Sequence, residues 1–598
     1  MIKLSDYVIR YLSSNGVSHI FMLPGGGCMH LVDSVGRNGN LEFVGCLHEQ
    51  AAAIAADGYA QYKNDIGVAL VTTGPGGTNA VTAVAASWID STPVLVISGQ
   101  VKRSDLMHKK GVRQMGVQEV DITRIVQPIT KYAVTVTEPE SIRYHLEKAV
   151  FLARNGRPGP VWIDIPLDVQ AALIEEDSLN GFCPDRTRAS EKGYLTDLVR
   201  RAIELLNHST KPVILAGRGI RIAGAEKAFK ELIHVLRIPV LTTWRAADLI
   251  GDDDEYFFGR PGSIASRYAN FVLQSADFLM TVGARLDLPQ VGFNYKNFAP
   301  KAKKVIVDVD EAEIKKTGID VEVPVVSDAA EFIKAFLENL RSVKPKDRSS
   351  WILKCKEWKE KYPVILPEYL DEKRETVNTY ALIECLSEVL TEEDIIVPGS
   401  SGSCAEITLQ ALRVKEGQRV INSPGLGSMG FGLPQSIGVC LASGKRRTIA
   451  IVGDGGLQHN IQELETLRRL NLPIKLFVLN NNGYASIRNT QNRFFKGHLV
   501  CCDPSSGLTL PDTCKIADVY GIKNTRIFNH RNLKGKIKEV LDTKGPFVCE
   551  IMVDPDLQIA PRLSSALKQN GTVESRSLED LWPFLDRDEL ARNLAEKK

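Results

Sequence analysis

The stretch VGDGG (452–456), followed by LNNNG (479–483), decides how this chain folds. Each stretch ends a short apolar run, and 27 residues separate Asp454 from Asn481, the length of one strand–helix–strand unit. Parallel strands of such units end at one edge of a sheet, where loops and helix N-termini meet a ligand. Glycines there let the backbone approach a diphosphate, and Asp454, Asn481 and the carbonyl of Gly483 offer hard oxygen ligands for Mg²⁺. Two ordinary turns are the alternative, which the combination at this spacing disfavours.

The alternation of apolar runs and helical stretches continues over the rest of the chain. Examples are VALVTTG (68–74), PVILAG (212–217) and TIAIVGDGG (448–456). This pattern is typical of parallel βα units, so we expect an α/β fold with three doubly wound, Rossmann-like parallel-sheet domains. The expected organisation is an N-terminal domain at 1–170, a central domain at 190–340, a linker at 341–372, a C-terminal domain at 373–555 and a tail at 556–598 that folds over the active site.

Composition excludes several classes of protein. The 598 residues are 44% hydrophobic and 24% charged, with a net charge of +2. This balance gives no electrostatic footprint for nucleic acid, and no apolar run is long enough to cross a membrane. The N-terminus has no signal-peptide pattern, and the 11 cysteines form no CxxC pair, which indicates reduced thiols in a cytoplasmic protein and disfavours zinc.

With these motifs the sequence resembles the thiamine diphosphate (ThDP) enzymes, whose cofactor signature is GDG, a spacer of this length and then NN. The resemblance implies that Asp454, Asn481 and the carbonyl of Gly483 bind Mg²⁺. It also implies contacts to ThDP from the GDGG turn and from PGSSGS (398–403), namely from Gly453, Gly455, Gly456, Ser400 and Ser401.

Two further motifs fit this resemblance. Glu49 opens a predicted helix in CLHEQAAAIAADGYAQY (46–62), where a carboxylate could simply stabilise the helix N-terminus. The resemblance instead implies that Glu49 is the catalytic carboxylate at N1′ of the ThDP aminopyrimidine, and we favour that interpretation. In SPGLGSMGFGLP (423–434), Met429 matches the apolar residue that bends the cofactor, and the Gly427 carbonyl matches the acceptor from its amino group.

Within the family the match is most similar to the acetolactate (acetohydroxyacid) synthase large-subunit branch. It includes Gly26 of LPGGGCMHL (23–31), which would line the reacting centre, Gln118 of GVQEVDI (116–122) and Lys131 of PITKYAV (128–134). In this branch the glutamate and the Mg²⁺ motif meet across a subunit interface, so a homodimer or homotetramer is implied. The implied partners are small molecules, a 2-oxoacid donor and a carbonyl acceptor.

The central block contains pieces similar to those with which the synthases bind a structural FAD. These are Arg285 of GARLD (283–287), Asp308 of VDVDEAEI (307–314) and Arg157 of GRPGP (156–160). Many relatives keep this fold empty or bind ADP, so FAD and an empty or ADP-filled domain stay open as alternatives.

Departures from the synthases lie where the second substrate would sit. By register, Leu167, Pro289 and Thr490 replace a lysine, an arginine and a tryptophan. A pocket without these cations should prefer an uncharged or bulkier acceptor. Arg488, Arg493 and Gln491 follow in ASIRNTQNRFF (485–495), and for Arg488 a role in the pocket and a solvated position are both open.

The function predicted from these motifs is ThDP- and Mg²⁺-dependent decarboxylation of a 2-oxoacid, with pyruvate as the expected donor, and ligation of the two-carbon unit to an acceptor carbonyl. A keto-sugar nucleotide is one hypothesis for that acceptor. The alternatives are a genuine acetolactate synthase of branched-chain amino-acid biosynthesis and a non-ligating decarboxylase or C–C lyase. A nicotinamide oxidoreductase is disfavoured because no GxGxxG with a downstream ribose acid follows a strand, and intact Glu49, Asp454 and Asn481 argue against an inactive subunit.

Overall fold

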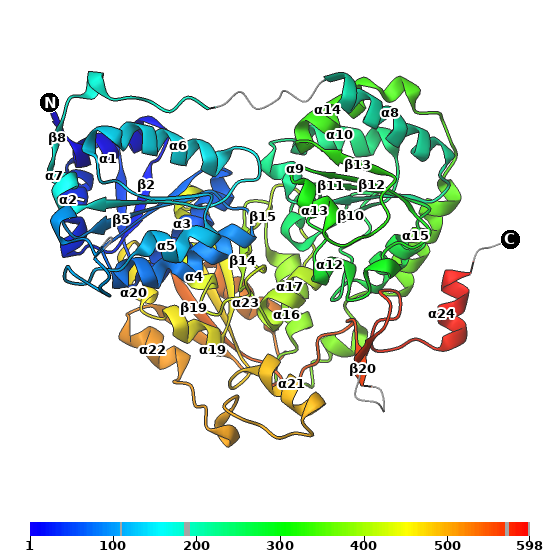
Figure 1. Ribbon diagram of the computed structural model, residues 1–598. Helices are drawn as coiled ribbons and strands as arrows, with labels where there is room; N and C mark the ends of the chain where they lie inside the picture. The colour runs from blue at the N-terminus through cyan, green and yellow to red at the C-terminus, as the bar shows by residue number, and fades with distance from the viewer. Residues whose placement is uncertain (108–109, 185–191, 568–572, 596–598) are drawn as a thin grey trace.

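The computed structural model describes residues 1–107, 110–184, 192–567 and 573–595, and it contains three parallel sheets, each covered by helices on both faces (Figure 1). This confirms the predicted fold class. Among the described residues, no helix combines the length and the apolar character needed to cross a membrane.

The N-terminal sheet has the strand order β3-β2-β4-β5-β7-β6. Helices α1, α2 and α6 pack on one face, and α3 and α4 pack on the other. The strands are β2 (His19–Met22), β3 (Glu42–Gly45), β4 (Gly67–Val71), β5 (Val94–Gln100), β6 (Tyr132–Thr135) and β7 (Val161–Pro166), and the helices are α1 (Leu4–Ser14), α2 (Met29–Arg37), α3 (Glu49–Lys63), α4 (Pro75–Ile89), α6 (Ile142–Arg154) and α7 (Leu167–Ala171).

The central sheet has the order β10-β9-β11-β12-β13. One face packs against α8, α10 and α14, and the other packs against α11 and α15. The strands are β9 (Pro212–Ala216), β10 (Val240–Thr242), β11 (Phe278–Val282), β12 (Lys303–Asp308) and β13 (Val323–Val326), and the helices are α8 (Lys192–His208), α10 (Glu226–Leu236), α11 (Arg267–Gln274), α14 (Ala329–Glu338) and α15 (Ser349–Lys361).

The C-terminal sheet has the order β15-β14-β16-β17-β19-β18 and contains both VGDGG (452–456) and LNNNG (479–483), at the ends of β16 and β17. Helices α16, α17 and α23 cover one face, while α18, α20 and α22 cover the other. The strands are β14 (Ile395–Pro398), β15 (Arg419–Val420), β16 (Thr448–Gly453), β17 (Ile474–Asn480), β18 (Lys523–Ile527) and β19 (Phe547–Met552), and the helices are α16 (Thr379–Val389), α17 (Ser403–Ala411), α18 (Gly432–Ala442), α19 (Asp454–Leu457), α20 (Glu463–Arg469), α21 (Ala485–Phe494), α22 (Thr513–Val519) and α23 (Leu533–Asp542).

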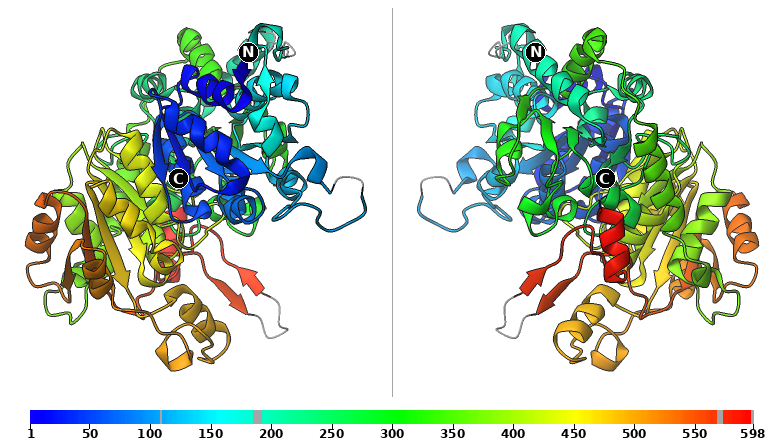
Figure 2. Two further views of the ribbon diagram at one scale, coloured as in Figure 1. Left: turned by 90° about the vertical axis from the view of Figure 1, so that its left-hand side faces the viewer. Right: turned by 90° about the vertical axis from the view of Figure 1, so that its right-hand side faces the viewer.

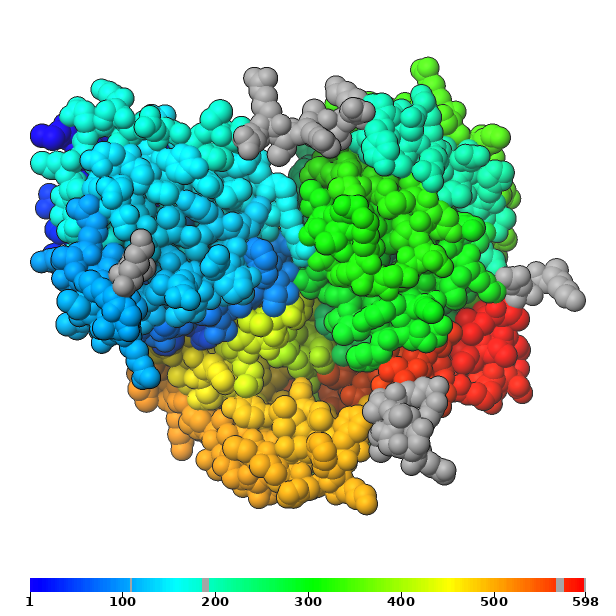
Figure 3. All heavy atoms as spheres, in the orientation of Figure 1, coloured from blue at the N-terminus to red at the C-terminus, as the bar shows by residue number. Residues whose placement is uncertain are grey.

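Helix α3 joins the N-terminal domain to the C-terminal domain by packing closely against α18. The helices approach so closely that a Cβ added at Gly438 would lie 1.9 Å from the carbonyl oxygen of Ala55. At the same contact, the fully buried carboxylate of Asp57 accepts hydrogen bonds from Gln61 and from Ser423. The two domains therefore share one hydrophobic core and a buried polar network, and all three domains pack against one another (Figure 3).

Residues 341–372, which we expected to form a linker, contain α15. Its Trp351 and Trp358 are buried in the same core as Phe271 of the central domain. The tail contains the hairpin of β20 (Ser565–Leu567) and β21 (Val573–Ser575), which projects from the body of the molecule, and then α24 (Arg587–Leu594) (Figure 2). Helix α24 docks on α15, where Trp358 Nε1 donates to Asn593 Oδ1 at 3.0 Å.

Candidate active site

Strands β16 and β17 bring the two halves of the GDG…NN motif together. They are parallel neighbours in which Gly453 pairs with Leu479, so the loops that follow them are adjacent. The Asp454 carboxylate is buried and accepts from the backbone N–H of Gly455 at 2.9 Å and of Gly483 at 3.1 Å. Burial raises the pKa of Asp454 to about 6, against the opposing effect of these amides.

The oxygen ligands in this pair of loops fit a divalent cation. The Asn481 side-chain oxygen is buried and has no hydrogen-bond partner among the described residues. An unpaired buried acceptor is costly unless a donor or a cation satisfies it. Gly483 has a φ of +132°, and a Cβ there would lie 2.2 Å from the Cys502 carbonyl oxygen, so only glycine fits. A carboxylate, an amide oxygen and a backbone carbonyl form the oxygen set that Mg²⁺ prefers.

The loops after β14 and β16 border open space. These strands are neighbours, but the chain leaves them in opposite directions along the sheet, which creates the crevice where open α/β sheets bind ligands. A Cβ added at Gly453 would meet nothing within 4 Å, and one at Gly456 would meet only the Gly430 nitrogen, at 3.9 Å. Ser400, buried beside them, donates its hydroxyl to the Ser428 carbonyl.

The segment 423–429 faces this crevice from the other side. Gly427 adopts a φ of +68°, and a Cβ there would lie 4.0 Å from Cβ of Ser401. Met429 is 39% exposed, although methionine is usually buried. These positions leave Met429 and the glycine backbone free to contact a ligand.

Three predicted residues lie on the N-terminal domain. Glu49 is buried at the start of α3, where Asn79 Nδ2 donates to its Oε2 at 2.9 Å. Gly26 lies in the loop after β2 and has open space at its Cβ position. Gln118 is exposed at a φ of +63°, and its carbonyl packs against Gly74, which follows β4.

A cavity of about 740 Å³ lies where the three domains meet. Six of the predicted residues line it: Arg157, Arg285, Asp308, Ser400, Ser401 and Gly427. Glu49, Gly26 and Gln118, all within the described ranges, are not among its lining residues. The cavity therefore connects the crevice of the C-terminal sheet with the central domain, and the three N-terminal residues lie elsewhere.

In the central domain the cavity opens between the ends of β9 and β11, the point where the strand order reverses. Arg157 pairs there with Glu313 at 2.6 Å, and Arg285 pairs with Asp287 at 2.7 Å. Burial raises the pKa of Asp308. Arg218 was not predicted; its Nη1 atom is buried without a hydrogen-bond partner among the described residues. The only sequence signal for Arg218 is its position directly after a strand, in AGRGIRIAG (216–224).

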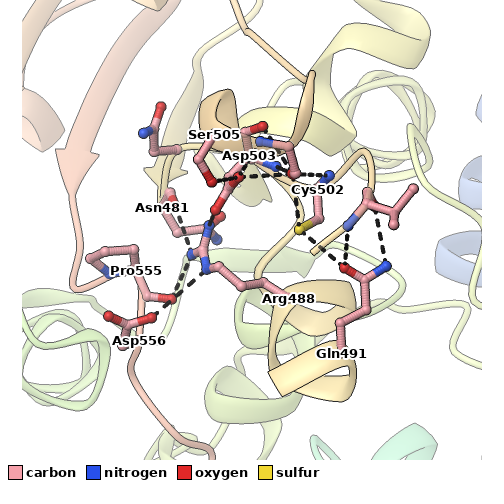
Figure 4. Close-up of polar contacts among 12 residues, drawn as sticks. Asn481, Arg488, Gln491, Cys502, Asp503, Ser505, Pro555 and Asp556 are labelled. Carbon is pink, nitrogen blue, oxygen red and sulfur yellow. Dashed lines mark hydrogen bonds and ion pairs between the residues drawn. The ribbon is translucent and has the colours of Figure 1, made fainter. Parts of the chain in front are cut away.

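The polar side chains of α21, which we expected near the acceptor pocket, contact the protein backbone (Figure 4). Arg488 is only 5% exposed, so the solvated position is wrong, and its guanidinium donates to main-chain carbonyls. The side-chain amide of Gln491 donates to the carbonyl of Val500 and accepts from its backbone N–H. Arg493 is exposed and donates to Ser564 at the start of the tail.

The three residues that differ from the synthases, Leu167, Pro289 and Thr490, lie in different parts of the molecule. Leu167 opens α7, and Thr490 is exposed on α21, where its hydroxyl donates to the Ser486 carbonyl. Pro289 lines the cavity.

Comparisons with known proteins agree with this geometry. Family models of the thiamine pyrophosphate (thiamine diphosphate) enzymes match residues 2–125 as the N-terminal TPP binding domain, 199–336 as the central domain and 400–551 as the C-terminal TPP binding domain. The chain is 32% identical to the probable acetolactate synthase large subunit of Methanocaldococcus jannaschii, over 92% of each protein. It is 31% identical to the acetolactate synthase isozyme 3 large subunit of Escherichia coli K12, over 91% of this chain and 92% of that protein. The chain therefore belongs to the thiamine pyrophosphate enzyme family and is an acetolactate synthase-like enzyme.

Proposed function

We propose that this enzyme uses ThDP and Mg²⁺ to decarboxylate a 2-oxoacid, with pyruvate as the donor, and ligates the two-carbon unit to an acceptor carbonyl. The observation that carries the proposal is the unpaired, buried Oδ1 of Asn481 beside the carboxylate of Asp454. When bound, ThDP would supply a nucleophilic carbon and a cationic ring that stabilises the negative charge left by the departing CO₂.

The residues of this chain would bind and orient that cofactor. Asp454, Asn481 and the Gly483 carbonyl would hold Mg²⁺, and the open backbone at Gly453 and Gly456 would take the diphosphate. Their amides need no side chain to reach a phosphate, which explains why space is left at these Cβ positions.

On the aminopyrimidine side, Glu49 would hold and exchange the proton at N1′. The hydrogen bond from Asn79 orients its carboxylate. The Gly427 carbonyl would accept from the amino group, and the exposed side chain of Met429 would pack against the cofactor. Because Glu49, Gly26 and Gln118 lie away from the cavity that Gly427 lines, we propose that a second copy supplies them, in a homodimer or homotetramer.

We propose FAD as the ligand of the central part of the cavity. The whole cavity has a volume of about 740 Å³, in the range of cofactor sites, and Arg218, Arg285 and Asp308 lie in its central-domain part at the strand-order reversal. Flavin absorbance in the purified protein tests this proposal, and a bound ADP or an empty domain would contradict it.

The acceptor is proposed to differ from a second 2-oxoacid, because Leu167, Pro289 and Thr490 supply no cation for a carboxylate. A keto-sugar nucleotide is the specific acceptor we propose. The names of the relatives favour acetolactate synthase as the second candidate function.

Product mass spectrometry with pyruvate, ThDP and Mg²⁺ tests the proposal, with and without a panel of keto-sugar nucleotides. A two-carbon-extended sugar supports it. Rapid formation of acetolactate from pyruvate alone would identify a genuine synthase, and release of free aldehyde without ligation would identify a decarboxylase.

A further inference from the structure

Arg488 lies seven residues after Asn481, in the first turn of α21, and its side chain turns back toward the loop that precedes the helix (Figure 4). Its Nη2 atom donates to the main-chain carbonyl of Asn481 at 3.0 Å and to that of Pro555 at 2.6 Å. Pro555 follows the end of β19, the strand beside β17. One guanidinium group therefore ties the loop carrying Asn481 to the segment after the neighbouring strand.

This contact matters because, among the described residues, Arg488 supplies the hydrogen bond to the Asn481 carbonyl. The Asn481 side-chain oxygen has no partner among the described residues, so the backbone alone sets where that oxygen lies. Gly483 is anchored by its N–H to Asp454, two residues further on. Arg488 thus supplies the hydrogen bond that holds the Asn481 carbonyl. Removing its guanidinium group would leave the carbonyls of Asn481 and Pro555 without this donor.

The two carboxylates near Arg488 form long ion pairs with it rather than hydrogen bonds. Its closest carboxylate oxygens are those of Asp556 at 3.8 Å and Asp503 at 3.9 Å, both beyond hydrogen-bond distance. Its Nε has no hydrogen-bond partner among the described residues. A cation this close to a Mg²⁺ site repels the metal, so any benefit to binding comes from the geometry that Arg488 imposes on the loop.

We propose that Arg488 is a positioning residue for the Mg²⁺–diphosphate site, holding the Asn481 peptide so that the side-chain oxygen faces the cation. This inference rests on the proposed function, because it requires that Asp454 and Asn481 bind Mg²⁺. It assigns to Arg488 no contact with substrate or cofactor.

The test is a Mg²⁺ titration of the full-length protein at saturating ThDP, read as the rise in thermal unfolding temperature. Arg488→Met keeps the apolar stem and removes the donors, whereas Arg488→Lys keeps the charge. Arg493→Met is the matched control, since Arg493 lies on the same helix but is exposed and contacts Ser564 and Ser565. We expect the Mg²⁺ half-saturation concentration to rise about tenfold or more in Arg488→Met, less in Arg488→Lys, and not at all in Arg493→Met, because only the Arg488 substitutions affect a charge-assisted hydrogen bond to the Asn481 carbonyl.

The outcomes separate this inference from the proposed function. A wild-type protein that shows no response to Mg²⁺ and ThDP would contradict the proposed function itself. A wild-type response with the same half-saturation in Arg488→Met would overturn the positioning role, even if that variant unfolds at a lower temperature without ligand. If Arg488→Met does not fold, Arg488→Lys decides: a raised half-saturation supports the role, and an unchanged one overturns it.

Discussion

Substitutions at two adjacent glycines, Gly455 and Gly456, should separate effects on the stability of the apoprotein from effects on ThDP binding. A Cβ at Gly455 would lie 2.4 Å from Cε1 of Tyr484, so the protein itself excludes a side chain there. A Cβ at Gly456 would meet only the Gly430 nitrogen, at 3.9 Å, so the apoprotein has room for it. If ThDP binds against this backbone, Gly456→Ala should impair binding without harming the fold.

The expected magnitudes follow from this difference. Both glycines lie in α19 at ordinary negative φ, so alanine at 456 should stabilise the apoprotein slightly, by up to about 1 kcal/mol. Blocking one amide-to-phosphate hydrogen bond costs about 1.5–3 kcal/mol, or about a 10- to 200-fold loss of ThDP affinity. Gly455→Ala should instead destabilise the apoprotein by about 1–3 kcal/mol, because the methyl group overlaps the Tyr484 ring.

The assay is thermal and denaturant unfolding of both variants without ligand, followed by calorimetric titration with ThDP at saturating Mg²⁺. The reasoning would be refuted by a Gly456→Ala protein that binds ThDP as tightly as the wild type. It would also fail if Gly456→Ala destabilised the apoprotein as much as Gly455→Ala does, because the space at 456 would then not be free.

Three further predictions concern other parts of the molecule. Glu49→Gln should abolish turnover while calorimetry still detects ThDP binding, and full activity in this variant would contradict the catalytic role. Gly483→Ala should lower the free energy of unfolding by about 2 kcal/mol or more and weaken Mg²⁺ binding, because its Cβ overlaps the Cys502 carbonyl. A variant that binds Mg²⁺ with the same half-saturation concentration as the wild type would contradict this prediction. Burial raises the pKa of Asp164 to about 7. Between about pH 4 and about pH 7 the folded state therefore keeps a proton that the unfolded chain has released. The contribution of this carboxyl group to stability falls as the pH rises through that range. Ser98 Oγ bridges Asp164 and Trp162 Nε1, so the fluorescence difference between wild type and Trp162→Phe should change near pH 7, and a flat profile would count against the shift.

The fold class was predictable because it depends on patterns that are local in sequence. Short apolar runs such as TIAIV (448–452) are strands buried on both faces, and only a parallel sheet covered by helices on both sides requires them repeatedly. The proximity of the loops that carry Asp454 and Gly483 was also predictable, because a single strand–helix–strand unit separates them. Both inferences need only the sequence between two neighbouring strands.

The environment of Arg488 was not predictable in the same way. Its partners are main-chain carbonyls, which every residue has, so no residue type marks them in the sequence. The Pro555 carbonyl comes from a segment 67 residues away, brought near only by the order of strands in the sheet. Helix α15 shows the same limit, because its lysines suggested a linker, whereas Trp351 and Trp358 are buried on the central domain.

The segment 423–429 explains why the three sheets should be regarded as one functional unit despite their separate sequence blocks. Ser423 is hydrogen-bonded to the buried Asp57 of α3, and a Cβ at Gly425 would lie 2.6 Å from Asp90, which pairs with Arg245 of the central domain at 2.8 Å. The loop that carries Gly427 and Met429 is therefore held by buried polar contacts from the N-terminal domain, and Arg245 of the central domain pairs with the aspartate that lies beside the loop. Such contacts are costly to break and leave the loop little freedom. We therefore expect a substitution of Asp57 or Asp90 to disturb the backbone against which the proposed cofactor would bind, and Gly425 and Gly427 of the same segment also line the cavity.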